Sequence, residues 1–267
     1  MNSTHRLDRV DILGIRFASL NATEAVDEAE RLFDQSKPAW IAVENVHALN
    51  LAAADPAHSH VLDSADLLLN DGKGLQLGAR ILGASFPADL NGNYFTPLLL
   101  DRAAERGWQV FLLGSSPGVV QRAREVLEVR HPGLRVVGTR DGYIPPGGDD
   151  DVCAQIAQSG AELLLVGMGM PLQERWLDNH LHDTGVRLAS TVGAFFDFQA
   201  GTVRRAPGWL NRVGLEWAFR LLVEPRRLWR RYLIGNPAFL WRILKQRLGA
   251  APTIGPGTGT KPDDDQR

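Results

Sequence analysis

The sequence predicts an α/β fold, a Rossmann-like, mostly parallel sheet flanked by helices, with a C-terminal helical appendage. Up to about residue 200, short leucine-rich or β-branched runs alternate with longer amphipathic segments, which is typical of successive βα units. Beyond that point the strand signals stop and basic, tryptophan-rich helical sequence follows. We therefore expect an α/β core domain at 1–202, a basic amphipathic appendage at 203–249 and a disordered tail at 250–267.

Six short apolar runs bounded by turn residues are the expected strands, at 39–45, 65–70, 109–114, 134–139, 162–169 and 187–193. The amphipathic stretches between them are the expected helices, at 22–36, 46–54, 75–83, 95–106, 117–130, 150–158 and 171–182. Breaker sequences support these boundaries. The "HPG" at 131–133 ends a helix, and the "IPPGGDDD" at 144–151 is typical of a surface loop.

Length and composition indicate an ordinary globular protein. The chain has 267 residues, 44% of them hydrophobic, which is enough to bury a substantial core. No window reaches the roughly 18 apolar residues that span a bilayer, and the N-terminal residues lack a signal-peptide pattern, so a cytoplasmic location is expected. The single cysteine, Cys153, has no disulfide or zinc partner and is expected to be a small buried side chain.

No metal or cofactor is expected from the residue patterns. Two acidic triplets, at 149–151 and 263–265, formally match the D-x-D motif that holds a divalent cation in some transferases. Both lie in polar loop or tail sequence, so they are interpreted as solvated charge. The seven histidines show no ligand spacing. Any diphosphate handled by this chain would have to be neutralised by something other than a metal, and the C-terminal arginines are the available charge.

The basic charge of the chain is gathered in one segment. The formal net charge is −2, yet residues 201–248 hold eleven Lys and Arg against two Glu, and four of the seven tryptophans. A nucleic-acid arm is disfavoured because the remainder of the chain is acidic and offers no basic groove to continue the path. A structural helical subdomain with a solvated basic face remains open. The favoured interpretation is an amphipathic appendage that lies on an anionic membrane surface.

Ligands of open parallel sheets bind beyond the carboxyl ends of the strands. The polar and glycine residues that follow the expected strands are Asn45, Asn70, Asp71, Gly72, Gly74, Gly114, Gly118, Gly167, Gly169, Gln173, Gly193 and Asp197. The "NDGKG" turn is the most informative, because a carboxylate between glycines could act as a general base on a hydroxyl. The residues alone leave open the alternative that Asp71 only caps the following helix. The "LGSSPG" turn lacks the Lys-Ser/Thr pair of a P-loop, and the G-x-G at 167–169 lacks the third glycine of a dinucleotide site.

Several of these motifs together resemble one family. They are the "DGKG" at 71–74, the "NG" at 91–92, "VFLLGSSPG" at 110–118, "VGMGMPLQERW" at 166–176, "GAFFDFQAG" at 193–201, "VRRAP" at 203–207 and "GLEWAFRLLVEPRRLWRRYLIGNP" at 214–237. In this order they resemble the WecG/TagA/CpsF glycosyltransferases over roughly residues 10 to 248. The resemblance implies a metal-independent, inverting enzyme without a cofactor. It would move a sugar from a UDP-sugar to a polyprenyl-diphosphate-linked sugar at the inner face of the cell membrane, in the synthesis of teichoic-acid linkage units, common antigens or exopolysaccharides.

The resemblance also assigns roles to individual residues. It implies that Asp71 is the catalytic base and that Asn45 lies in its pocket. The other substrate-binding residues that it implies, together with those of the strand-end turns, are Gly72, Gly74, Asn91, Gly92, Gly114, Gln173, Arg220, Arg227 and Arg230. The three arginines are expected to close over the diphosphate. The chain departs from the family pattern at Val43, where a threonine is common, at Asp89, where a basic residue is common, and at Asn91, where a small hydroxyl is common.

Two other classes of function are kept as alternatives. One is a non-catalytic scaffold of the same fold that binds a lipid diphosphate. The other is a soluble dehydrogenase-type enzyme, which would bind a nicotinamide nucleotide without dependence on lipid. Partial exposure of an apolar appendage is also compatible with a small homo-oligomer.

Overall fold

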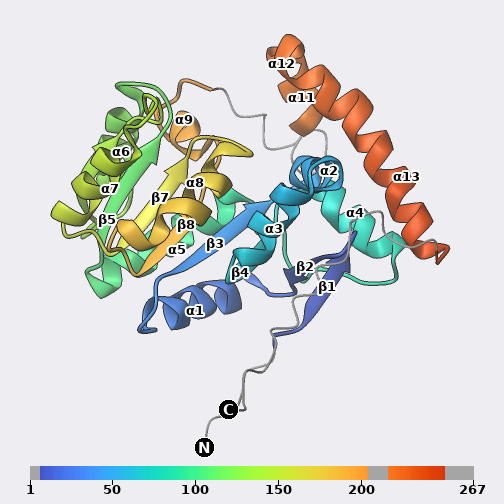
Figure 1. Cartoon of the computed structure of the whole chain (residues 1–267), viewed down its shortest axis with the longest axis horizontal. Helices are drawn as coiled ribbons and strands as arrows, with labels where there is room; N and C mark the ends of the chain where they lie inside the picture. The colour runs from blue at the N-terminus through green and yellow to red at the C-terminus, as the bar shows by residue number, and fades with distance from the viewer. Residues whose placement is uncertain (1–6, 204–215, 250–267) are drawn as a thin grey trace, which may run out of the picture.

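The computed structural model describes residues 7–203 and 216–249 of the chain, apart from the side chains of Glu216, Arg220 and Arg227. A sheet of six parallel strands forms its centre, with helices on both faces (Figure 1). The strands are β3 (Ala39–Glu44), β4 (Leu67–Asn70), β5 (Gln109–Gly114), β6 (Arg135–Arg140), β7 (Leu163–Gly167) and β8 (Leu188–Thr191). Their order across the sheet is β4-β3-β8-β7-β5-β6. This confirms the predicted fold class.

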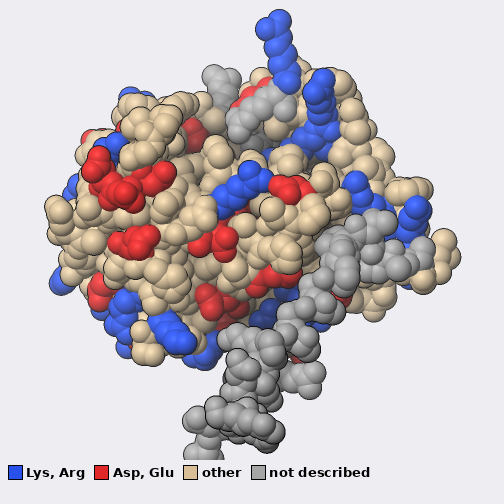
Figure 2. Space-filling view, viewed as in Figure 1, with Lys and Arg blue, Asp and Glu red and all other residues tan. Residues whose placement is uncertain are grey.

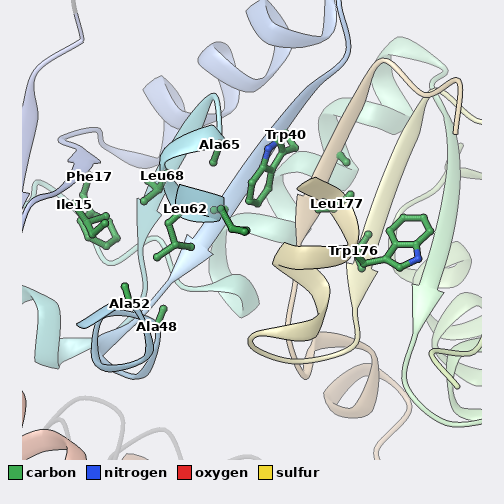
Figure 3. Close-up of a cluster of buried hydrophobic side chains, with 14 of the residues drawn as sticks. Ile15, Phe17, Trp40, Ala48, Ala52, Leu62, Ala65, Leu68, Trp176 and Leu177 are labelled. Atoms are coloured by element: carbon green, nitrogen blue, oxygen red, sulfur yellow. The ribbon is translucent and has the colours of Figure 1, made fainter. Parts of the chain in front are cut away.

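Both faces of the sheet are covered, which explains why the strands are nearly continuous apolar runs. One face packs against α2 (Val46–Ala54), α3 (Pro56–Ser64), α4 (Lys73–Ile81), α7 (Asp149–Gln158) and α8 (Leu172–His180). Figure 3 shows this cluster, in which Trp40 of the sheet lies between Leu62 of α3 and Leu177 of α8. The other face packs against α1 (Ala22–Phe33), α5 (Gly92–Arg106), α6 (Val119–Arg130) and α9 (Phe195–Gln199).

Three elements were not expected from the sequence. An antiparallel hairpin, β1 (Arg9–Ile12) and β2 (Ile15–Ala18), turns through Leu13 and Gly14, which both have positive φ. Leu-Gly is not a usual hairpin signal, because a branched side chain disfavours positive φ. Helix α3 begins at an Asp-Pro pair whose aspartate, Asp55, accepts a hydrogen bond from the Ala57 N–H. The third element is the short α9.

The first acidic triplet lies in a helix and not in the expected loop. Asp149, Asp150 and Asp151 form the first turn of α7, where negative charge is favourable near the helix N-terminus. Asp149 also accepts a hydrogen bond from the Trp176 indole at 2.9 Å. The second triplet and the expected tail at 250–267 lie outside the described residues. Cys153 is buried as expected, and burial raises the pKa of its thiol to about 11.

The described part of the C-terminal segment is helical. It consists of α11 (Glu216–Val223), α12 (Pro225–Trp229), a π-helical turn η2 (Arg230–Gly235) and α13 (Asn236–Arg247). Helix α13 runs alongside α2 and α4 (Figure 1). No helix in the described ranges is both long and apolar enough to span a bilayer.

Helix α13 is anchored by an aromatic side chain that needs a glycine opposite it. Phe239 and Ile243 are fully buried, and a Cβ on Gly78 of α4 would lie 2.7 Å from the Phe239 ring. Hydrogen bonds add to this contact. The Asn50 side chain donates to the Gly235 carbonyl at 2.8 Å and accepts from Arg242 at 2.6 Å. The C-terminal segment is therefore packed onto the core at α2 and α4.

Replacing Phe239 with alanine should lower the free energy of unfolding by about 3 kcal/mol, because it leaves a cavity between α13 and α4. Trp241→Ala is the matched control, since Trp241 lies on the same helix and is 56% exposed. Urea denaturation of the two variants and the wild type measures the difference. Equal stability of both variants would show that the Phe239 contact does not anchor the helix.

Candidate functional site

A cavity of about 1140 Å³ lies where the carboxyl ends of β3, β4 and β8 meet the C-terminal segment. Its floor comes from the residues that follow these strands: Asn45, Val46, His47, Asp71, Gly72, Lys73, Gly74 and Val192. One wall comes from the start of α5 and the loop before it, and the opposite wall from the C-terminal segment. β3 has β4 on one side and β8 on the other, so the chain connections diverge here, as they do at the ligand crevices of open α/β sheets.

Asp71 and Asn45 are held together on this floor. The Asn45 side chain donates to Asp71 Oδ2 at 3.0 Å, while its own oxygen accepts from the His47 N–H and so caps α2. The Asp71 N–H donates to the Glu44 carbonyl at 2.7 Å. Helix α4 has Gly72 at its N-cap and no side-chain cap, so the structure does not support the alternative role of Asp71 as a helix cap. The carboxylate instead lines the cavity.

The glycines of the "DGKG" turn have distinct reasons to be glycines. Gly72 has φ +91°, a left-handed conformation that side chains disfavour, and its N–H donates to Asp89 Oδ1 at 2.8 Å. A Cβ on Gly74 would lie 2.6 Å from the Val46 side chain, so this glycine lets α4 begin close to α2. The turn therefore brings backbone N–H groups to the cavity edge.

Asn91 and Gly92 form the N-terminus of α5, three residues earlier than the expected start of that helix. No side chain caps this end, and Gly92 packs close to the Val192 carbonyl of the loop after β8. The N-termini of α2, α4 and α5 thus all border the cavity. Helix N-termini carry partial positive charge and unpaired N–H groups, which favours binding of an anion.

The C-terminal segment contributes an arginine that sequence reasoning missed. Arg231 and Tyr232 of η2 line the cavity, and the Tyr232 ring lies 6.0 Å from that of Trp217. The expected Arg230 is exposed, stacks over Trp229 and is not among the lining residues. The side chains of Arg220 and Arg227 lie outside the described residues. The adjacent arginines of "WRRY" indicate positive charge next to the site. Which of the two lines the cavity depends on the π-helical turn, which the sequence does not predict.

Two other expected site residues lie away from this cavity. Gln173 is fully buried and its side-chain oxygen accepts from the N–H groups of Gly169 and Gly193, each at 3.2 Å. Gly114 lies at the end of β5, where a Cβ would be 2.4 Å from the carbonyl of Gly167. Both residues shape the loops that follow β5, β7 and β8. Neither is among the residues that line the cavity.

Electrostatics on the cavity floor are set by few groups. Burial, followed by the charges of Arg231 and His58, lowers the pKa of His47 to about 4, so its imidazole is neutral at pH 7. The Lys73 ammonium lies 3.9 Å from Asp89 at the rim. Among the described residues there is no group of three or more His, Cys, Asp or Glu arranged to hold a metal ion.

The low pKa of His47 predicts a measurable pH dependence. The unfolded chain binds a proton here below pH about 6.5 and the folded chain only below about 4, so stability is lost as the pH falls between these values. His47→Gln should therefore show a smaller drop in melting temperature from pH 6.5 to pH 4 than the wild type. His60→Gln, at an exposed position of α3, is the control. If the melting temperatures of the wild type and His47→Gln fell in parallel between pH 6.5 and pH 4, the lowered pKa of His47 would be contradicted.

Comparison with known proteins shows the family of the chain. The family model "Glycosyl transferase WecG/TagA/CpsF family" matches residues 10–252. A protein of Bacillus spizizenii named N-acetylglucosaminyldiphosphoundecaprenol N-acetyl-beta-D-mannosaminyltransferase is 32% identical over 88% of this chain and 91% of its own length. Proteins of the same name from Bacillus subtilis and Staphylococcus aureus are 28% and 27% identical, covering 88% and 90% of this chain and 91% and 93% of their own lengths. With a match over most of its length, the chain belongs to the WecG/TagA/CpsF family of glycosyltransferases.

Proposed function

We propose that this chain is an inverting, metal-independent glycosyltransferase that moves a sugar from a UDP-sugar to a polyprenyl-diphosphate-linked sugar. It would act at the cytoplasmic face of the cell membrane, in cell-surface polysaccharide or teichoic-acid-type biosynthesis. The observation that carries the proposal is the presence of Asp71 and Arg231 in the same cavity. The names of the relatives support the acceptor, since they specify a diphosphoundecaprenol that carries N-acetylglucosamine.

Asp71 would serve as the general base. In an inverting displacement the acceptor hydroxyl attacks the anomeric carbon and gives up its proton, and one positioned carboxylate can accept it. The hydrogen bond from Asn45 to Asp71 Oδ2 fixes the orientation of this carboxylate on the cavity floor. A neutral His47 next to Asn45 adds no competing positive charge.

The departing UDP gains negative charge on its diphosphate, which the cavity could stabilise without a metal. Arg231 lines it from the C-terminal segment and Lys73 lines it from the floor that the core provides. The uncapped N-termini of α4 and α5 add backbone N–H donors. Arginine forks and oriented N–H groups stabilise a developing anion in the same way as an oxyanion hole.

The outer side of the C-terminal segment fits a membrane surface. Its exposed large apolar side chains include Leu222, Val223, Trp229, Leu233, Ile234, Trp241, Leu244 and Leu248. Arg226 and Arg230 are exposed on the same segment, and Figure 2 shows basic side chains projecting from its end of the molecule, while acidic side chains gather over the opposite part. Amphipathic helices of this composition bind anionic bilayers. We therefore assign Arg230 to the lipid phosphates, while Arg220 and Arg227 keep the diphosphate role that the resemblance implies.

A non-catalytic scaffold with the same fold is the alternative. It would need the cationic wall and the apolar outer side but not a positioned carboxylate. The hydrogen-bonded Asp71–Asn45 pair at the cavity floor favours the enzyme.

Asp71→Asn should lower the rate of UDP release by on the order of 10²–10⁴-fold, because the amide cannot accept the proton. The assay mixes a panel of UDP-sugars with a short-chain polyprenyl-diphosphate N-acetylglucosamine. Asp63→Asn, at an exposed position of α3, is the control. An inactive wild type that still binds the acceptor lipid would favour the scaffold, and an unchanged rate in Asp71→Asn would exclude Asp71 as the base.

The neighbouring arginines should separate two effects. Arg231→Gln should reduce kcat by on the order of 10²-fold with little effect on vesicle binding, because it removes charge from the cavity. Arg230→Gln should weaken binding to phosphatidylglycerol vesicles by about fivefold and leave UDP release from a water-soluble acceptor unchanged. If both variants lose kcat, or both lose vesicle binding, the assignment of Arg231 to the cavity and of Arg230 to the lipid surface is wrong.

A further inference from the structure

Directly behind the cavity floor lie two buried carboxyl groups that the proposed chemistry does not use. Glu44 is the last residue of β3 and Glu174 is in the first turn of α8, and both are fully buried. The alternation of β3 directs Glu44 to the same face as Trp40 and Ala42, which pack in one cluster with Leu177 of α8. The two carboxyl groups are close enough for a side-chain hydrogen bond between them to shift the pKa of each.

The partners of these oxygens are incomplete. Glu174 Oε1 accepts from the Gln173 side chain at 2.6 Å. Glu174 Oε2 and both oxygens of Glu44 have no donor among the described residues. Ionised carboxylates only accept hydrogen bonds, so two of them cannot satisfy each other, and two like charges in a buried site repel. One proton between them resolves both problems, because the protonated group donates to its ionised neighbour.

We propose that Glu44 and Glu174 share one proton and act together as positioning residues for Asp71 and Gln173. The proposal rests on the proposed function insofar as Asp71 is the base. Each of the two residues is connected to one part of the site. The backbone carbonyl of Glu44 accepts a hydrogen bond from the Asp71 N–H, and Glu44 immediately precedes Asn45. Glu174 holds the amide of Gln173, which in turn holds the N–H groups of Gly169 and Gly193.

The surrounding charges agree with a retained proton. Burial raises the pKa of Glu44 well above its ordinary value, and Glu174 and Asp71 raise it further, whereas Arg231 of η2 opposes them. Burial also raises the pKa of Glu174, against the hydrogen bonds it accepts and the charge of Arg175. The coupling between Glu44 and Asp71 is mutual, so negative charge on the pair favours proton uptake by Asp71 when the acceptor hydroxyl is deprotonated.

The shared proton can be tested without any activity assay. The folded wild type keeps a proton that the unfolded chain releases above the ordinary glutamate pKa of about 4.3, so its stability falls as the pH rises above that value. Glu44→Gln keeps a donor and one negative charge but removes this proton. The melting temperature of the wild type minus that of Glu44→Gln should therefore decrease, by roughly 3 °C per pH unit, as the pH rises from about 5 for as long as the pair keeps its proton.

Glu125→Gln, at an exposed position of α6, is the control and should follow the wild type. Glu174→Gln should behave like Glu44→Gln. The shared proton would be overturned if the melting temperatures of the wild type, Glu44→Gln and Glu174→Gln changed in parallel from pH 5 to pH 8. This measurement decides the question even if the protein releases no UDP.

Positioning is tested by a second substitution at the same site. Glu44→Leu fills the space without hydrogen bonding, and apolar replacement of a buried carboxyl group is commonly neutral or stabilising. We expect Glu44→Leu to be folded and at least as stable as the wild type at pH 8, yet to lose kcat by on the order of tenfold or more, because the Asp71 turn shifts. Glu44→Gln should restore kcat to within about threefold of the wild type. Full activity of Glu44→Leu would show that the pair does not position the site, whereas an inactive wild type would refute the proposed function instead.

Discussion

The contact between Phe239 and the surface of Gly78 is the constraint on which the site depends. It fixes α13 against α4, and α4 begins at the glycine turn that carries Asp71. Because η2 continues directly into α13, the same contact sets where Arg231 enters the cavity. A larger residue at Gly78 would push the helix outward and move the cation away from the carboxylate. The packing of one aromatic ring therefore determines the distance between two charges from opposite parts of the chain.

The core contributes preorganised helix dipoles in addition to the Lys73 cation. Three helices begin at the cavity, and the N-cap residues of two of them, Gly72 and Asn91, make no side-chain cap hydrogen bond. At the start of α4 the Gly72 N–H donates to Asp89 instead. This arrangement follows from parallel strand order, since every strand ends at the same edge and a helix begins soon after it. Gly74 and Gly92 let these helix ends pack closely against Val46 and Val192, while Gly72 supplies the positive φ of the turn before α4.

Much of the core could be predicted from sequence because its signals are local. Apolar runs mark all six strands of the parallel sheet, and the "NDGKG" turn marks the position of Asp71. The hairpin was missed because Leu13 adopts a positive φ that its side chain disfavours, so no turn signal exists. Arg231 was missed because a π-helical turn changes the facing of neighbouring side chains, and nothing in "WRRYLIG" specifies that turn. Glu44 was missed because a strand-end glutamate normally indicates exposure.

Asp71 and Arg231 come from distant parts of the chain. Asp71 follows β4, whereas Arg231 lies on η2 of the C-terminal segment, so the cavity combines the two charges only while that segment is packed onto the core. Placing Arg231 on a segment whose outer side is apolar and basic makes the assembly of the cavity depend on that segment. Under the proposed function, contact of this outer side with a bilayer would bring the cavity to the lipid-linked acceptor and displace bulk water, which would disfavour hydrolysis of the donor.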